Sequence, residues 1–361
     1  MDQSKVRRRL KIGLSLPVAY IQALARYNWQ FLEIGKRFSL ALREHYLPGE
    51  AFECGLLNPA LPASMIKGSI SRSRLVAVQR KVNPMAWESA LYNKGVFYHI
   101  CLAAGLPVPA LYAVIPRKVR GWTSFGRMPR TSVEWEEFFV RDCPQSFVIK
   151  PCRSEYGVGL FFAERQGDRF LLNDGTSLTS RELVGKILDN PEFDSYVIQE
   201  RIHNSPELAP LGEVRGVHSF RVVTLIGDDG EARVVAADMK IITGDNVASN
   251  LAHGSRGNYI ADIDRDTGCL RTVLAIDIRN GGYKKLSHHP ETGADLEGLR
   301  IPQWGCITAL AKKAAAVFSP VGTIGWDIAL RETGPCIMEG NIWYSPSLTG
   351  YLRDYWAISY E

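Results

Sequence analysis

The chain has 361 residues, of which 46% are hydrophobic and 22% charged, an ordinary profile for a soluble globular protein of one large domain or two to three lobes. Its net charge of +5 is modest for this length, so it suits a phosphate-rich ligand and does not indicate nucleic-acid binding. The seven cysteines are scattered without zinc-site spacing, as expected of reduced thiols in a cytoplasmic protein. No apolar run approaches the roughly 18 residues of a membrane-spanning helix.

Residues 17–46 are predicted to be helical, because apolar side chains recur there at steps of three and four residues. Basic residues occupy the positions between them. Such a helix either packs against the protein with a basic outer face or lies peripherally on a membrane or partner, and both interpretations stay open. Residues 47–85 carry several prolines and glycines and are expected to be a loop-rich connection. We assign residues 1–85 to a helical N-terminal region.

The middle of the chain alternates helices and strands. A helix is predicted from about residue 85 to 104, with Gly105 ending it and a strand following over residues 110–115. Strands are predicted at residues 146–150 and 160–163 on either side of a glycine-containing loop. A short helix at residues 180–189 and a strand at residues 195–199 complete this part, which we take as a lobe spanning residues 86–202.

Strands dominate the second half, which we take as a lobe spanning residues 203–361. Residues 219–226 and 232–242 are predicted to form a hairpin around Gly-Asp-Asp-Gly. A helix is expected at residues 301–319. Two paired strands follow, at residues 323–330 and 336–339, with a Gly-Pro turn. Because the strands and helices do not alternate strictly, the sequence predicts an α+β fold and not a doubly wound sheet.

Two carboxylates and one amide stand on the last predicted strand pair. Asp327 lies on the first strand, and Glu339 and Asn341 lie on the second. Oxygen ligands of this kind facing one cleft would hold a hard cation such as Mg²⁺, which completes its coordination with water and phosphate. A strand pair with carboxylates placed there by chance is the alternative.

Lys150 ends a predicted strand and precedes a loop that contains Ser154, Gly157 and Gly159. A lysine there can neutralise phosphate oxygens, and such a loop can bring backbone N–H groups against them. The pattern is not a P-loop, since the lysine precedes the glycines. The alternative is a surface hairpin turn with a solvated lysine. Likewise, the strand end at Gln199 and Glu200 can contact adenine and ribose or be merely solvated.

The order of these pieces resembles the ATP-grasp superfamily of carboxylate–amine ligases, over roughly residues 85–350. The segment from Glu339 to Gly350 looks like the metal-binding strand of D-alanine–D-alanine ligases. The segments 208–224, 249–254 and 325–328 look more like the sugar-transfer-associated group of ATP-grasp proteins and the related α-L-glutamate ligases. The resemblance implies an ATP-grasp fold, with the nucleotide held between two α+β lobes.

The resemblance also implies roles for individual residues. Asp327, Glu339 and Asn341 would hold Mg²⁺, with Glu339 bridging two ions. Lys94 would be a second ATP-contacting lysine, although a surface lysine on a helix is the equal alternative. The remaining ATP contacts would come from the phosphate-binding lysine, the lid loop and the adenine hinge, which are Lys150, Ser154, Gly157, Gly159, Gln199, Glu200, Arg201 and Ile202.

The sequence departs from the family pattern in two places. The lid loop has fewer glycines than usual, with Glu155 and Tyr156 in their place. Many ligases also carry an arginine two residues before the first metal carboxylate, where this chain has Gly325. Arg221 could supply that charge from a neighbouring strand to the transferring phosphoryl group. A structural salt bridge made by Arg221 is the competing interpretation.

Residues 243–258 form a long polar loop between strands, and long loops on a rigid sheet commonly carry substrate contacts. Lys240, Asn250, His253 and Arg256 are the candidates for contacts with a carboxylate or phosphate, with Lys240 and Arg256 joining Arg221 as catalytic cations. A mobile surface loop without a site is the alternative.

Together the resemblance implies an ATP- and Mg²⁺-dependent ligase that forms an acyl phosphate and ADP and then an amide or peptide-like bond. The substrates would be a small-molecule, peptide-linked or saccharide-linked carboxylate and an amine acceptor, and the sequence names neither. A phosphotransferase on the same fold and a non-catalytic ATP-binding regulator are the alternatives.

Overall fold

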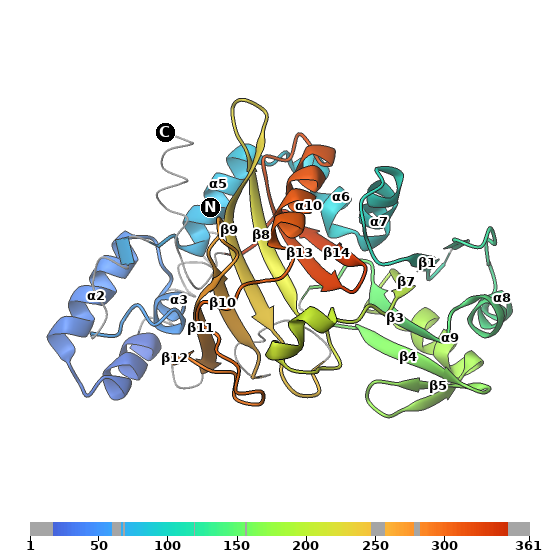
Figure 1. Cartoon of the computed structure of the whole chain (residues 1–361), viewed down its shortest axis with the longest axis horizontal. Helices are drawn as coiled ribbons and strands as arrows, with labels where there is room; N and C mark the ends of the chain where they lie inside the picture. The colour runs from blue at the N-terminus through green and yellow to red at the C-terminus, as the bar shows by residue number, and fades with distance from the viewer. Residues whose placement is uncertain are drawn as a thin grey trace, which may run out of the picture.

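The computed structural model describes residues 17–59, 66–67, 69–118, 120–155, 157–246, 257–277 and 282–345. Two seven-stranded sheets with antiparallel pairing form its framework, and helices pack against them (Figure 1). This combination agrees with the predicted α+β class. No helix in these ranges is both long and apolar enough to cross a membrane.

The first sheet lies at one end of the long axis of the molecule, at the right of Figure 1. Its aromatic core includes Phe139, Phe147 and Phe170, all fully buried beneath the helices α8 and α9. The helical segments are α8 (Ser132–Glu137), the π-helical turn Phe138–Asp142 and α9 (Ser180–Leu188). The strands in spatial order are β2 (Trp122–Thr123), β1 (Leu111–Pro116), β7 (Ser195–Glu200), β3 (Ser146–Pro151), β4 (Phe161–Gln166), β5 (Arg169–Leu172) and β6 (Ser177–Thr179).

The second sheet forms the centre of the molecule, and α10 (Trp304–Val317) packs on it. Its core extends to residues that precede the first sheet in the chain, including Phe97 and Tyr98. The strands in spatial order are β12 (Gly282–Leu286), β11 (Leu270–Asp277), β10 (Tyr259–Ile263), β9 (Ala232–Ile241), β8 (Ser219–Ile226), β13 (Thr323–Arg331) and β14 (Gly334–Asn341). The short 3-10 helix Pro206–Leu211 connects the two sheets along the chain.

The N-terminal region differs from the prediction of one helix followed by loops. The helix divides into residues 17–26 and α2 (Phe31–Arg43), because Asn28 and Trp29 adopt positive φ angles of 53° and 57°. The segment expected to be loop-rich contains two further helices, α3 (Pro48–Glu53) and α5 (Arg72–Val82). The prolines that suggested loops partly begin helices instead, since proline is well tolerated at the first helical position. Residues 19–66 contribute a small hydrophobic core of their own.

The helix predicted from residue 85 to 104 is also divided, into Met85–Trp87, α6 (Glu88–Tyr92) and α7 (Lys94–Ala103). Asn93 separates the last two and caps α7, its side-chain oxygen accepting hydrogen bonds from the backbone N–H groups of Gly95 at 3.0 Å and Val96 at 3.3 Å. The predicted hairpins are confirmed, but Gly334 and Pro335 belong to β14. The turn before them is Glu332-Thr333.

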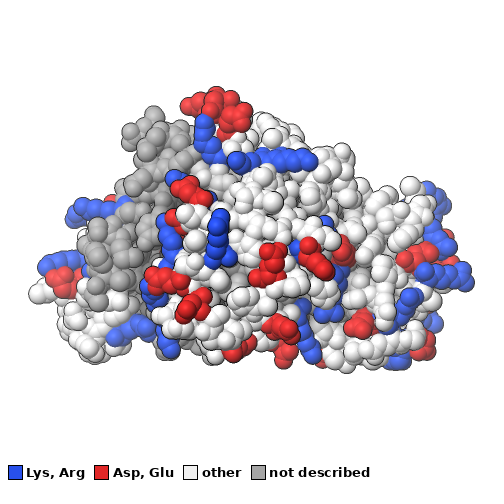
Figure 2. Space-filling view, viewed as in Figure 1, with Lys and Arg blue, Asp and Glu red and all other residues white. Residues whose placement is uncertain are grey.

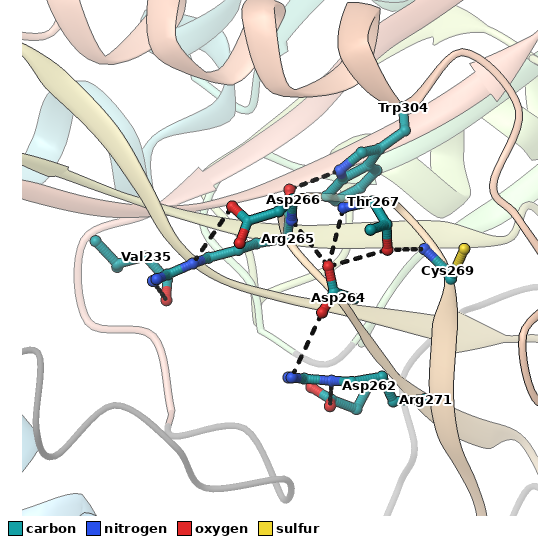
Figure 3. A network of polar contacts seen from close by, with 9 residues as sticks. All are labelled: Val235, Asp262, Asp264, Arg265, Asp266, Thr267, Cys269, Arg271 and Trp304. Carbon is teal, nitrogen blue, oxygen red and sulfur yellow. Dashed lines mark hydrogen bonds and ion pairs between the residues drawn. The ribbon is translucent and has the colours of Figure 1, made fainter.

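A polar network fastens α10 to the turn between β10 and β11 (Figure 3). The Asp264 carboxylate accepts hydrogen bonds from the backbone N–H groups of Asp266 and Thr267 and thereby shapes the turn. The Trp304 indole N–H donates to the Arg265 carbonyl at 2.9 Å. Gly268 follows at φ 76°, with the Trp304 ring so close that a Cβ atom would lie 2.4 Å from it. The turn between β10 and β11 and the start of α10 therefore pack directly against each other.

Asn83 joins the end of α5 to the central sheet. Its buried side-chain amide donates to the carbonyls of Thr323 and Ile342, both at 3.1 Å. Its oxygen accepts from the Thr323 N–H at 2.9 Å. A second bond of the same kind runs from the Gln79 amide to the Tyr344 carbonyl at 2.9 Å. These contacts join segments about 240 to 265 residues apart in the chain.

Replacing Asn83 with alanine removes the partners of three buried backbone groups, and we expect the free energy of unfolding to fall by roughly 2–4 kcal/mol. Urea denaturation followed by circular dichroism measures the loss. Arg80→Ala is the matched control, since Arg80 is exposed on the same helix. An Asn83→Ala protein as stable as the control would show that these bonds do not hold the helix to the sheet.

Candidate functional site

The hairpin of β13 and β14 brings the three predicted metal ligands together. Asp327 pairs with Glu339 across the ladder, and Gly325 pairs with Asn341. Asn341 donates from its amide to the Gly325 carbonyl at 3.3 Å and to Glu339 Oε1 at 3.4 Å. The set contains two carboxylates and one amide. Among the described residues there is no group of three or more His, Cys, Asp or Glu side chains arranged to hold a metal ion.

Asp327 is buried and already holds two cations. Arg221 on β8 donates to both carboxylate oxygens, from Nε at 2.7 Å and from Nη2 at 2.9 Å. Lys240 on β9 lies 3.3 Å and 3.2 Å from the same two oxygens. Although burial would raise it, the charges of Arg221 and Lys240 hold the pKa of Asp327 well below its usual range. Asp327 is therefore ionised at any physiological pH.

Arg221 also occupies the space beside Gly325, the position at which the resemblance leads us to expect an arginine. A Cβ atom on Gly325 would lie 2.9 Å from Tyr344 and 3.1 Å from Arg221 Cδ. An arginine at position 325 would thus collide with both. The salt bridge expected of Arg221 is present, and its predicted catalytic role stays a prediction.

Lys150 ends β3 on the other sheet and is electrostatically linked to this hairpin. Burial lowers the pKa of Lys150 to about 8, with the charge of Glu339 opposing the shift and that of Lys94 adding to it. Lys94 stands at the start of α7 and donates from Nζ to the Ser154 carbonyl at 3.0 Å. Both lysines therefore lie at the base of the loop over residues 151–159.

Two glycines give this loop its shape. Gly157 and Gly159 have φ angles of 71° and 74°, which side-chain-bearing residues rarely adopt. A Cβ atom on Gly159 would also lie 2.7 Å from both Phe193 and Pro151. The loop consequently packs closely against the first sheet at its second end.

In the predicted adenine hinge, residues 199–202, some side chains have hydrogen-bond or packing partners and others have an unpaired polar atom. Gln199 is buried, and its Oε1 has no hydrogen-bond partner among the described residues. Glu200 accepts from the Ala110 N–H at 3.0 Å and from Arg331 at 3.3 Å. Arg201 stacks its guanidinium 4.8 Å from the Phe162 ring centre, and Ile202 packs with apolar residues. Gln199 Oε1 and Arg201 Nε are thus both buried polar atoms without a hydrogen-bond partner among the described residues.

Three predicted substrate residues, Asn250, His253 and Arg256, lie outside the described residues. The flanks of their loop are joined, since Asn258 Oδ1 accepts from the Thr243 N–H at 3.1 Å and from Asn246 at 2.9 Å. A hollow of about 450 Å³ lies next to the loop, lined by Glu213, Val214, Arg215, Gly244 and Asp245.

Sequence reasoning missed two buried groups near the site. Tyr98 on α7 donates to the Met338 carbonyl at 2.6 Å, directly before Glu339. His218, just before β8, accepts from the Ile242 N–H at 3.1 Å, and burial lowers its pKa to about 4, so it is neutral. Neither has a local signal, because each acts through a partner distant in sequence.

The sequence from residue 73 to 350 matches a family model described as sugar-transfer associated ATP-grasp. The chain belongs to this family. The predicted superfamily and the predicted ATP-grasp fold are confirmed, and the domain boundaries at residues 85 and 202 stay predictions. A search of curated proteins finds no match to this ATP-grasp chain.

Several solved structures are similar to this ATP-grasp protein. D-alanyl-alanine synthetase A from Vibrio cholerae is 10% identical, with a TM-score of 0.40, and the match covers 76% of this chain and 62% of that one. N5-carboxyaminoimidazole synthase from Aspergillus clavatus is 11% identical (TM-score 0.38; 76% and 51% covered). VanG D-Ala:D-Ser ligase from Enterococcus faecalis is 14% identical (TM-score 0.39; 78% and 65% covered). The chain thus spans between about half and two thirds of these proteins.

An ATP-grasp fold implies Mg²⁺, and the donor set fits the ion unequally. Glu339 and Asn341 are half-buried oxygen donors with few competing contacts. Asp327 also offers oxygens, but an ion there would be a third positive charge on a carboxylate that Arg221 and Lys240 already neutralise. The fit is therefore best at Glu339 and Asn341, with Asp327 able to contribute only while it shares its oxygens.

Replacing Asp327 with asparagine removes the main counter-charge of the partly buried Arg221 and Lys240, leaving Asp238 and Glu339 as the remaining negative charges acting on Arg221. We expect a loss of about 3 kcal/mol in the free energy of unfolding. Glu339→Gln, which breaks no ion pair, should change it by less than about 1 kcal/mol. Thermal and urea denaturation compare the two. Equal stability of the two variants would contradict the structural role of the Asp327 pairs.

Proposed function

We propose that this protein is an ATP-dependent ligase that converts a carboxylate into an acyl phosphate, releases ADP, and joins the acyl group to an amine. The observation that carries the proposal is the placement of α7, which donates from Lys94 to the Ser154 carbonyl in the loop after Lys150 at 3.0 Å and from Tyr98 to the Met338 carbonyl, next to Glu339, at 2.6 Å. The lowered pKa of Lys150, caused mainly by burial and opposed by the charge of Glu339, agrees with this placement. Lys150 and Glu339 come from different sheets. A polyphosphate bound between them would supply an anionic partner for Lys150, which makes no ion pair with the described residues.

In this proposal the nucleotide lies between the two sheets. Lys150 and Lys94 bind phosphate oxygens, and the loop with Ser154, Gly157 and Gly159 covers them. The orphaned Gln199 oxygen supports an adenine site, because it can accept a hydrogen bond from the adenine amino group. Glu200 and Ile202 would contribute little through their side chains, which already contact Arg331 and the apolar cluster, whereas Arg201 keeps an unpartnered Nε although its guanidinium stacks on Phe162.

Glu339 and Asn341, together with a shared oxygen of Asp327, would hold Mg²⁺. When bound, the ion neutralises charge on the β- and γ-phosphates and orients them for in-line displacement. Arg221 and Lys240 keep Asp327 ionised and fix it against the sheet. Because two cations share one carboxylate, a net positive charge would remain near the position expected for the transferring phosphoryl group.

The reaction proceeds in two steps. A carboxylate oxygen of the substrate attacks the γ-phosphorus, and the bond from that phosphorus to the bridging oxygen of ADP breaks. The amine then attacks the acyl carbon and expels phosphate. The hollow beside Arg215 and Asp245 and the loop with Asn250, His253 and Arg256 are the proposed acceptor region. Closure of the lid loop would protect the acyl phosphate from water.

The pH dependence of ATP binding tests the role of Lys150. Since the pKa of Lys150 is about 8 in the free protein, the amine is charged below pH 8 and loses its charge above it. Phosphates raise this pKa, so binding above pH 8 takes up a proton, and affinity should be roughly tenfold weaker at pH 9 than at pH 7.

Isothermal titration in buffers of different ionisation enthalpy measures the proton uptake directly. Lys150→Gln should bind ATP weakly and without this pH dependence. Equal affinities of the parent protein at pH 7 and pH 9 would rule out a titrating phosphate-binding Lys150.

Hydroxylamine trapping tests the chemistry. With a panel of carboxylic acids, ATP and Mg²⁺ but no amine, we expect ADP to accumulate and a hydroxamate to form from the competent acid. Glu339→Gln should remove this activity. Glu332→Gln, on the exposed turn of the same hairpin, is the matched control and should keep it.

Other products would contradict the proposal in distinct ways. AMP with pyrophosphate would mean an adenylate intermediate. ADP with a substrate phosphorylated on a hydroxyl group would mean a phosphotransferase. Turnover by Glu339→Gln within about threefold of the parent would remove Glu339 from the site, since a threefold change is well under 1 kcal/mol of barrier.

A further inference from the structure

The N-terminal helices carry an apolar surface that the rest of the described protein leaves exposed. Val18 and Ile21 are 55% and 56% exposed on helix 17–26, and Trp29, Phe31 and Leu32 are 55%, 55% and 80% exposed at the turn into α2. We call these five residues the N-terminal apolar face. They belong to neither the nucleotide site nor either sheet.

The N-terminal apolar face is separate from the side of the same helices that packs into the hydrophobic core. Ala19, Ala23 and Leu24 on the first helix are buried with Ile34 and Phe38 of α2. Val18 and Ile21 are spaced three residues apart, so at about 100° per residue they lie on the opposite side of the first helix from Ala19 and Ala23. A helix that is apolar on both sides is typical of one whose second side also meets an apolar environment.

The turn at the end of the face holds its aromatic rings outward. Asn28 and Trp29 have positive φ angles, and the Trp29 N–H is bonded to the Leu24 carbonyl at 2.8 Å. The Trp29 and Phe31 rings lie beside one another, with centroids 5.8 Å apart. The Tyr20 hydroxyl donates to the Phe31 carbonyl at 3.2 Å and fixes the start of α2. The protruding rings are thus built into a fixed backbone.

The net charge of the N-terminal part of the chain indicates which kind of surface the N-terminal apolar face binds. Residues 1–43 contain nine Lys or Arg and two Asp or Glu, a net charge of +7, whereas the whole chain carries +5. The remaining 318 residues therefore carry a net charge of −2. Exposed Arg26, Lys36 and Arg43 lie on the helices themselves. Figure 2 shows basic side chains at this end of the molecule, with acidic side chains beside some of them.

We propose that the N-terminal apolar face docks on an anionic membrane surface. Trp29 and Phe31 would enter the interfacial region of the lipid, where aromatic rings are favoured, and Leu32 would reach the acyl chains. Arg26, Lys36 and Arg43 would meet the headgroups, with Lys36 exchanging its exposed ion pair with Glu33 for lipid phosphates. The face lies at the end of the long axis opposite the first sheet, so docking leaves the lid loop free (Figure 1).

Vesicle co-sedimentation of the full chain tests this proposal. We expect the protein to sediment with vesicles of mixed phosphatidylglycerol and phosphatidylcholine and to stay in solution with phosphatidylcholine alone. The double variant Trp29→Ser with Leu32→Ser should bind the anionic vesicles about tenfold or more weakly. Met128→Ser with Val133→Ser is the matched control, because both residues are exposed and apolar near the first sheet, and it should bind like the parent.

Three outcomes would overturn the proposal. The parent protein could stay in solution with anionic vesicles, or both double variants could bind equally. Sedimentation velocity without lipid could show instead that the parent self-associates and the Trp29/Leu32 variant does not, which would assign the face to a second copy of this chain. ATP binding in the absence of vesicles should be unchanged in both variants, so a failure here is distinguishable from a failure of the ligase proposal.

Discussion

The buried carboxylate of Asp327 is the interaction on which the central sheet and the candidate site both depend. It draws a guanidinium from β8 and an ammonium from β9 onto β13, so three adjacent strands share one charge cluster. A carboxylate or cation left alone there would carry a large desolvation cost, so the cluster is stable only as a set. With β13 fixed in this way, ladder pairing places Glu339 and Asn341 beside it without further contacts.

Helix α7 and its capping residue Asn93 connect structural features of the two sheets. Asn93 sets the start of the helix, Lys94 holds the Ser154 carbonyl of the lid loop, and Tyr98 holds the Met338 carbonyl beside Glu339. One short helix therefore contacts the proposed lid loop at its first residue and β14, which carries the proposed metal ligands, one turn later. This arrangement explains why the charge of Glu339 acts on Lys150, although the two residues belong to different sheets.

Local pattern was enough to predict the two hairpins, α9 and α10, because alternation and helical spacing are local properties, whereas the roles of Lys150, Gln199 and Glu339 came from the resemblance and stay predictions. It failed where a distant partner decides. Asn83 bonds residues some 240 positions away, and the strands β10 to β12 are defined by their ladder neighbours more than by their own composition. The salt bridge between Arg221 and Asp327 likewise joins residues 106 positions apart, so no sequence spacing reveals it.

The bonds from Gln79 and Asn83 to the segment 342–344 bring the beginning and the end of the ATP-grasp region to one point on the central sheet. The two ends of the ATP-grasp region therefore meet on this sheet. The N-terminal helices attach close to this point. Arg74 forms an ion pair with Glu44, and the Ser73 hydroxyl donates to the His45 carbonyl. The helices also have a hydrophobic core of their own. Because these attachments involve no described strand, the N-terminal helices could be changed without disturbing the pairing of either sheet, so the proposed membrane contact and the proposed chemistry are structurally separate.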